Sequence, residues 1–123
     1  ERADGTVATM PLEAVSETDT IFDCGPETVA NLQKRVQEAS TVLWNGPFGN
    51  YEAGFTEGTE KVAEALADSE AASYVGGGDT VAAIEAIARN DDFTFVSTGG
   101  GSMLAFLEHG TLPALPHLLT TSN

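Results

Sequence analysis

The stretch SYVGGGDTVAAIEAI, residues 73–87, decides the fold of this protein. It begins as a short strand of β-formers, passes through three consecutive glycines and an aspartate, and continues with the apolar spacing of a helix. Ordered glycine costs conformational entropy, so three in a row indicate that bare backbone is required at this point. A strand that runs through glycine into a helix predicts a βα unit.

The same arrangement occurs four times along the chain. Four short apolar or β-branched runs are bounded by glycine, in DTIFDCGP, TVLWNGPFG, ASYVGGGD and FTFVSTGGG, at residues 19–26, 41–49, 72–79 and 93–101. Helical patterns follow them, at residues 26–39, 56–69, 79–90 and 101–110. The near-continuous apolar runs are typical of strands covered on both faces. We therefore predict an α/β fold with a parallel sheet and flanking helices, a Rossmann-like three-layer αβα arrangement with about four βα units.

The predicted α/β domain occupies residues 19–110. Residues 1–18 are predicted to be an edge segment or a loose start, and residues 111–123, with Pro113 and Pro116, an extended C-terminal tail. The chain has 123 residues, which corresponds to at most one domain. It lacks an initiator methionine, so we expect it to be part of a longer protein.

Composition excludes several classes of partner. The formal net charge is −14, with five Lys and Arg against 19 Asp and Glu. Nucleic acids and anionic membranes bind clustered basic residues, so neither is an expected partner. No apolar run reaches the roughly 18 residues of a membrane span, and the first ten residues lack the apolar stretch of a signal peptide. The single cysteine, Cys24, excludes an internal disulfide and fits a reducing cytoplasm.

The glycine turns predict a phosphate site. Ligands of parallel α/β sheets bind beyond the carboxyl ends of the strands, and helix N-termini that follow glycine attract phosphate. The alternative for each turn is a tight connection without a ligand, but two triple-glycine turns in one short chain favour phosphate. A Walker A loop is excluded because no glycine precedes a lysine. The pattern G-x-G-x-x-G also fails, since it ends at Val81 from Gly76 and at Leu104 from Gly99.

The ensemble of motifs resembles one family. DCGPETV, TVLWNGPFGNYE, GFTEGTEKVAEALA, VGGGDTVAAI and STGGGSMLAFLEHGTLPAL have the order seen in phosphoglycerate kinase, from about Asp19 to Leu115. They resemble the second half of its nucleotide-binding C-terminal domain. The resemblance implies a cytoplasmic glycolytic enzyme that transfers a phosphoryl group between 1,3-bisphosphoglycerate and MgADP, giving 3-phosphoglycerate and MgATP. The family's N-terminal domain, with its basic patch for phosphoglycerate, has no counterpart here.

The resemblance also implies roles for individual residues. Glu52 corresponds to the glutamate that binds the nucleotide ribose, and Asp79 to the aspartate that meets Mg²⁺. Residues that would line the cleft or bind nucleotide and transferring phosphate are Asn45, Pro47, Gly76, Gly77, Gly78, Thr80, Thr98, Gly99, Gly100 and Gly101. Among them, Gly78, Gly100 and Gly101 would take part in catalysis. The sequence departs from the family at Ser102-Met103, where Ala-Ser is usual, and at Tyr51, which is often Phe.

The cations of a phosphoryl-transfer site are missing from the glycine loops. Lys34, Arg35 and Lys61 fall in the middle of predicted helices, and Arg89 falls in a last helical turn. The family's lysines that hold nucleotide phosphates also have no counterpart. We therefore expect the isolated chain to be inactive and, although the family is monomeric, to self-associate through an uncovered edge and apolar surface. The alternative function is a non-catalytic nucleotide-binding or structural module.

Other conspicuous residues are expected to be structural. Cys24 is predicted to be a buried thiol and Trp44 a core residue beside the cleft. Asp91 and Asp92 fit a polar turn. The two histidines, His109 and His117, are expected to be solvated or packed and not to bind a metal.

Overall fold

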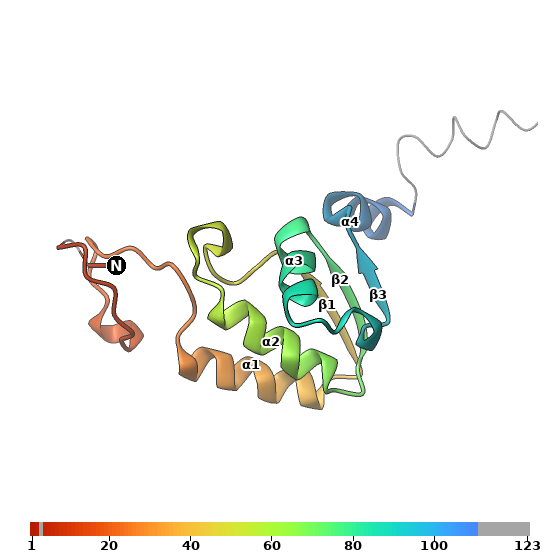
Figure 1. Ribbon diagram of the computed structural model, residues 1–123, viewed down its shortest axis with the longest axis horizontal. Coiled ribbons are helices and arrows are strands. Elements are labelled where there is room, and N and C mark those ends of the chain that lie inside the picture. The colour runs from red at the N-terminus through yellow and green to blue at the C-terminus, as the bar shows by residue number, and fades with distance from the viewer. Residues whose placement is uncertain (3, 111–123) are drawn as a thin grey trace, which may run out of the picture.

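A computed structural model describes residues 1–2 and 4–110 as a parallel α/β fold (Figure 1). Three strands, β1 (Thr41–Asn45), β2 (Ala72–Gly76) and β3 (Phe95–Ser97), pair in the order β1-β2-β3. The four helices are α1 (Pro26–Glu38), α2 (Glu57–Ala67), α3 (Gly78–Ala86) and α4 (Gly100–His109). Short 3₁₀ helices are η1 (Leu12–Ala14), η2 (Tyr51–Ala53) and η3 (Asn90–Asp92). The predicted fold class is confirmed, with three strands in place of about four.

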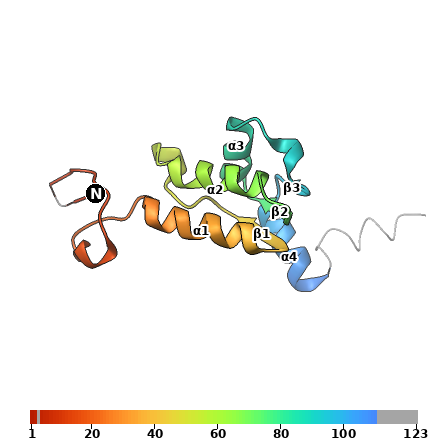
Figure 2. The ribbon, with the colours of Figure 1, turned by 90° about the horizontal axis from the view of Figure 1, so that it is seen from below.

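The two faces of the sheet differ in how they are covered. Figure 2 shows α3 on one side of the sheet and α4 on the other, and α2 lies on the side of α3. Trp44 and Val75 point into the core formed with α2 and α3, where Leu66 and Ile84 are fully buried. Leu43, in contrast, is 51% exposed on the opposite face. The apolar runs predicted strands covered on both faces, but α4 covers only part of the second face.

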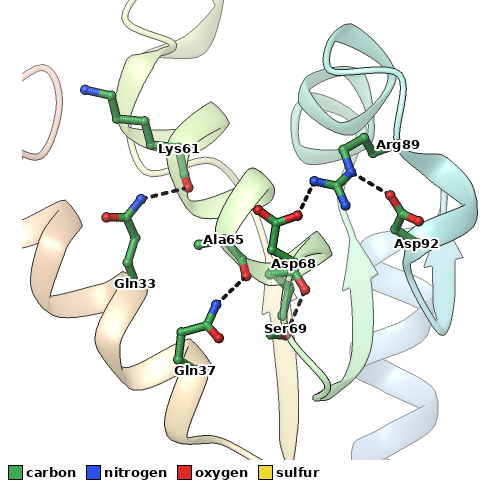
Figure 3. Close-up of polar contacts among 9 residues, drawn as sticks. Gln33, Gln37, Lys61, Ala65, Asp68, Ser69, Arg89 and Asp92 are labelled. Atoms are coloured by element: carbon green, nitrogen blue, oxygen red, sulfur yellow. Dashed lines mark hydrogen bonds and ion pairs between the residues drawn. The ribbon is translucent and has the colours of Figure 1, made fainter.

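Helix α1 packs against α2 and extends the core away from the sheet. Its apolar positions Val29 and Val36 recur at helical spacing and are buried. Two glutamine side chains of α1 also donate hydrogen bonds to backbone carbonyls of α2: Gln33 to Lys61, at 3.3 Å, and Gln37 to Ala65, at 3.1 Å (Figure 3). The position of α1 is therefore fixed by apolar burial together with a short polar ladder.

The short strand predicted within DTIFDCGP, residues 19–26, does not form. The Phe22 carbonyl accepts a hydrogen bond from the Asn50 amide, and the Asp23 carboxylate accepts from the amides of Cys24 and Gly58, at 2.8 and 3.1 Å. A strand needs a neighbouring strand, whereas this segment is held by single bonds to the β1–α2 connection and the start of α2. The segment is apolar, as the sequence indicates, but it bonds to the N-terminus of α2 and not to a neighbouring strand.

The end of α3 also differs from the sequence prediction. The helix ends at Ala86, and Ala88 adopts a left-handed φ of 54°. Arg89 therefore lies beyond the helix and forms ion pairs with Asp68 and Asp92 (Figure 3). These partners draw the guanidinium to the α2–β2 connection and η3, so the expected position in a last helical turn is wrong.

The remaining described segments add no strand to the sheet. Residues 4–18 are almost entirely exposed and contain η1, and the backbone groups of Glu1 and Thr20 exchange two hydrogen bonds that close this segment into a loop. The predicted tail, 111–123, with His117, lies outside the described residues. Within residues 1–2 and 4–110, no helix combines the length and the apolar character required to cross a membrane.

Candidate functional site

The carboxyl ends of all three strands meet at one edge of the sheet. Asn45, Gly76 and Ser97 are register partners across β1, β2 and β3. The loop after β2 enters α3 at Gly78, and the loop after β3 enters α4 at Gly100. The expectation that the two triple-glycine turns lie at the same edge is therefore confirmed for residues 76–78 and 99–101.

At three positions of the two glycine loops, tight packing or backbone conformation explains why the residue is glycine. A Cβ on Gly100 would lie 2.3 Å from Asn45 Oδ1 and 2.5 Å from the Gly77 nitrogen. A Cβ on Gly76 would lie 2.6 Å from Met103 Cε and 3.1 Å from the Gly100 Cα. Gly77 adds a φ of +98°, which side-chain residues rarely adopt. Gly76, Gly77 and Gly100 thus have a structural reason to be glycine.

Gly78 and Gly101 have no such reason. A Cβ on either residue would meet nothing within 4 Å, and neither residue has a positive φ. Both are exposed, each in the first turn of its helix. The competing interpretation, that the loops are only structural turns, accounts for the packed glycines but leaves these two without a function.

Both helices begin without a side-chain cap. The N-cap residues are Gly77 for α3 and Gly99 for α4, and neither supplies a capping hydrogen bond. The first amides of an α-helix have no partner within the helix, and the helix dipole places partial positive charge on them. The close approach of Gly77 and Gly100 brings the two N-termini together. The arrangement can attract an anion without any basic side chain.

The residues around the glycines include an unusual buried hydroxyl. Thr80 is fully buried, and its Oγ1 has no hydrogen-bond partner within the described residues. It would lie 3.5 Å from a Cβ on Gly77, directly below the loop. Most buried polar groups in proteins are paired, so this hydroxyl fits a ligand-binding loop better than a purely structural turn.

The acidic residues of the predicted site are Glu52, in η2, and Asp79, in the first turn of α3. Burial raises the pKa of Tyr51, and the negative charges of Glu60 and Asp79 raise it further. Glu52, the predicted ribose ligand, follows Tyr51 and is exposed. No group of three or more His, Cys, Asp or Glu capable of holding a metal occurs within residues 1–2 and 4–110. Asp79 could therefore supply a single carboxylate, with the other ligands coming from phosphate oxygens, water or other protein.

The connection after β1 brings its predicted residues to the same edge. The Trp44 side chain is buried and donates a hydrogen bond from Nε1 to the Gly46 carbonyl, at 2.7 Å, which confirms its core position. This bond holds the turn in which Asn45 is exposed and Pro47 half-buried. Thr98 and Gly99 are exposed after β3, and the Ser97 hydroxyl accepts a bond from the Gly99 amide.

None of the ion pairs within the described residues involves a residue of the two glycine loops. Lys61 pairs with Glu57, Lys34 pairs with Glu38, and Arg89 pairs with Asp68 and Asp92. A hollow of about 1150 Å³ lies between the N-terminal segment and the first turns of α1 and α2, and no glycine-loop residue lines it. The site is thus an open, dipolar edge, and the cations of phosphoryl transfer would have to come from outside the described residues.

Two residues that support the site were not predicted from the sequence. Asp23 anchors the first turn of α2, and the absent side chain of Gly58 leaves room for it, because a Cβ there would lie 2.6 Å from Asp23 Oδ1. Met103 closes over Gly76. An Asp three residues before a helical pattern and a Met within an apolar helix are weak local signals. Cys24 was predicted to be a buried thiol and is half-buried, and this partial burial raises the pKa of its thiol.

The packed glycines lead to a prediction about stability. Gly100→Ala places a methyl group against the Gly77 backbone, so we expect the free energy of unfolding to fall by about 1–3 kcal/mol. Gly101→Ala is the matched control one residue later, where the methyl group enters open space, and it should not destabilise the fold. Urea unfolding of both variants measures the difference. Equal midpoints for the two variants would contradict the tight packing of the loops.

Comparisons with known proteins place the chain in one family. The family model of phosphoglycerate kinase matches residues 1–110. The solved structure of phosphoglycerate kinase from Coxiella burnetii is 44% identical, with a TM-score of 0.75, over 90% of this chain and 29% of that chain. Phosphoglycerate kinase from Pyrococcus horikoshii OT3 is 38% identical, with a TM-score of 0.71, over 81% of this chain and 25% of that one. The chain therefore spans less than a third of the length of these relatives.

Proposed function

We propose, from the premise that this chain belongs to the phosphoglycerate kinase family, that it supplies the nucleotide- and phosphate-binding loops of that enzyme. The reaction would be phosphoryl transfer between 1,3-bisphosphoglycerate and MgADP, giving 3-phosphoglycerate and MgATP in the cytoplasm. The chain would form the second half of the nucleotide-binding C-terminal domain. Phosphoglycerate and the basic groups that hold it would belong to the remaining part of the enzyme.

The observation that carries the proposal is the open space at Gly78 and Gly101. Neither the packing nor the backbone conformation of the described chain requires glycine at these two positions. Phosphate bound by backbone amides does require it, because a side chain would stand between the amides and the phosphate oxygens. The unpaired, buried Thr80 hydroxyl below the same loop supports the proposal.

The two loops would divide the work. Phosphoryl transfer depends mainly on positioning and on electrostatic stabilisation of charge on the transferred group. The amides at Gly77, Gly78 and Thr80 would hold the nucleotide phosphates. The amides of Gly99, Gly100 and Gly101, beside Thr98, would stabilise the group in transfer. Their tight contact through Asn45 fixes the distance between the two sets of amides.

The residues around the first loop also fit a magnesium nucleotide. Mg²⁺ is usually bound by one or two carboxylates together with phosphate oxygens and water, and it neutralises phosphate charge. Asp79 offers one carboxylate in the first turn of α3, next to the amides that would hold phosphate. Glu52, with Asn45 and Pro47, would line the ribose side of the cleft.

Removal of the Asp79 carboxylate tests this assignment. The measurement uses a full-length chimaera in which this chain replaces the matching segment of the Coxiella burnetii enzyme. We expect Asp79→Ala to weaken MgATP by about 10- to 100-fold, and metal-free ATP much less, because the lost group binds the metal. Asp91→Ala, which removes an exposed carboxylate from η3, is the control. Equal weakening of MgATP and metal-free ATP by Asp79→Ala would contradict the metal role.

The alternative is a nucleotide-binding or structural module without catalysis. It predicts that the chimaera binds nucleotide, or folds, but transfers no phosphoryl group even with every family residue in place. Turnover of the unmodified chimaera, followed in a coupled assay with ATP and 3-phosphoglycerate, decides between the two. A folded chimaera that binds both substrates without turnover would overturn the proposed function.

A further inference from the structure

Phe22 and Asp23, in the segment where the sequence predicted a strand, hold part of the β1–α2 connection in place. The Phe22 carbonyl accepts a hydrogen bond from the Asn50 amide, at 2.8 Å. The Phe22 ring stacks on the ring of Phe55, with centroids 4.8 Å apart and ring planes at 12°. Asn50 and Phe55 flank η2, which carries Glu52. Phe22 therefore contacts the chain on both sides of this short helix.

The Asp23 carboxylate fixes the same segment to α2. Its Oδ2 accepts a hydrogen bond from the Gly58 amide, at 3.1 Å, and its Oδ1 accepts one from the Cys24 amide, at 2.8 Å. The Gly58 amide lies in the first turn of α2, where amides have no partner within the helix and the dipole favours a negative charge. Thr56, the N-cap residue, makes no side-chain cap hydrogen bond. Asp23 thus acts as the cap of α2 from a distant segment.

Two glycines from different segments leave room for this carboxylate. A Cβ on Gly49 would lie 2.7 Å from Asp23 Cγ, and a Cβ on Gly58 would lie 2.6 Å from Asp23 Oδ1. Neither glycine has a positive φ, so packing and not backbone conformation explains glycine at both positions. The Asp23 carboxylate therefore lies where three parts of the chain meet: its own segment, the β1–α2 connection and the start of α2.

We propose that Phe22 and Asp23 are positioning residues that hold η2 so that Glu52 meets the nucleotide ribose. The proposal rests on the proposed function, in which Glu52 binds the ribose hydroxyls. Glu52 is exposed, so the backbone of η2 determines where its carboxylate can reach. Binding groups that are held in place before the ligand arrives lose less conformational entropy on binding. We call Phe22 and Asp23 the clip, and every contact that defines it is made between described residues.

The part of the connection next to β1 has anchors of its own. The Phe48 amide donates a hydrogen bond to the buried Thr59 hydroxyl, at 3.1 Å, and Trp44 Nε1 donates one to the Gly46 carbonyl. Loss of the clip should therefore loosen η2 and leave the turn at Gly46 and the two glycine loops in place. The expected defect is selective for the ribose of the nucleotide and spares its phosphates.

Nucleotides with and without ribose hydroxyls measure this selectivity. In the full-length chimaera, Asp23→Ala removes both hydrogen-bond acceptors of the clip. We expect it to weaken ATP by about tenfold and 2′,3′-dideoxy-ATP by less than about twofold, because only ATP carries the hydroxyls that Glu52 would bind. The matched control is Asp19→Ala, which removes a carboxylate that accepts a bond from the Ser16 amide, at 2.8 Å. It should change neither dissociation constant.

A double-mutant cycle with Glu52→Ala tests whether the clip acts through Glu52. In that background Asp23→Ala should weaken ATP no further, whereas additive losses would overturn the proposal. Unchanged ATP affinity, or equal weakening of both nucleotides, would also overturn it. A chimaera that binds no nucleotide would overturn the proposed function together with the clip. Thermal melts confirm that each protein is folded. Should Asp23→Ala unfold, Asp23→Asn, which keeps one acceptor oxygen, is expected to show the same selectivity, with Asp19→Asn as its control.

Discussion

Gly101→Val should reduce kcat for phosphoryl transfer by at least about a hundred- to a thousandfold in the full-length chimaera, while ATP binding changes little. The valine side chain enters the open space beside the first turn of α4, where the transferring phosphoryl group would approach the amides. Loss of a single donor to a developing anion costs about 10²- to 10³-fold in other enzymes. A side chain that keeps the phosphoryl group from several amides should cost at least as much.

Stability measurements separate this effect from damage to the fold. Because a Cβ at Gly101 meets nothing within 4 Å, the variant should melt close to the parent. Gly101→Ala is the graded control, since its smaller side chain should leave part of the activity. A Gly101→Val protein that melts normally and keeps full turnover would refute the role of this loop. If activity falls only in proportion to the folded fraction, the loop is a structural turn.

The isolated 123-residue chain should show no turnover with ATP and 3-phosphoglycerate. Lys34, Lys61 and Arg89 form ion pairs with acidic residues outside the glycine loops, and the chain spans 29% and 25% of the two solved relatives. Helix N-termini can bind phosphate, but they cannot position the phosphoglycerate that would accept or donate it. A coupled assay at high protein concentration measures this directly. The Asp79→Asn variant serves as the control for contaminating kinase.

Measured turnover would change the interpretation only if it belongs to this chain. Activity that Asp79→Asn abolishes would show that the described loops suffice, and that the missing part is not essential. Activity that is unchanged by Asp79→Asn would come from a contaminant. The expected result is a rate at the level of the buffer control for both proteins.

Much of the fold was predictable because its signals are local. Three of the four predicted strands and all four helices form within a few residues of their predicted positions. Glycine interrupts the pattern at the carboxyl end of each strand, and the helical spacing of apolar residues begins directly afterwards. Since the carboxyl ends of parallel strands share one edge, these local signals were sufficient to bring residues 76–78 and 99–101 together.

The same local signals could not decide whether a strand forms within residues 19–26. The run Ile21-Phe22 has the apolar character of a strand, but a strand also needs an edge on which to pair. Here Asp23 binds the amide of Gly58 at the start of α2, an interaction between residues 35 positions apart. The apolar content of β1, β2 and β3 likewise predicted cover on both faces, but the position of α4 leaves Leu43, Tyr74 and Phe95 exposed.

The sequence by itself determined that two triple-glycine turns precede two helices, and this pattern predicted a phosphate site. Which glycines are packed and which are open was decided only by the tertiary structure. Gly77 and Gly78 are adjacent and chemically identical, as are Gly100 and Gly101. Their roles separate because the Asn45 side chain and the facing loop fill the space beside Gly77 and Gly100, and leave the next position of each loop open. This difference cannot be predicted from one segment alone, because it arises where the ends of three strands are in contact.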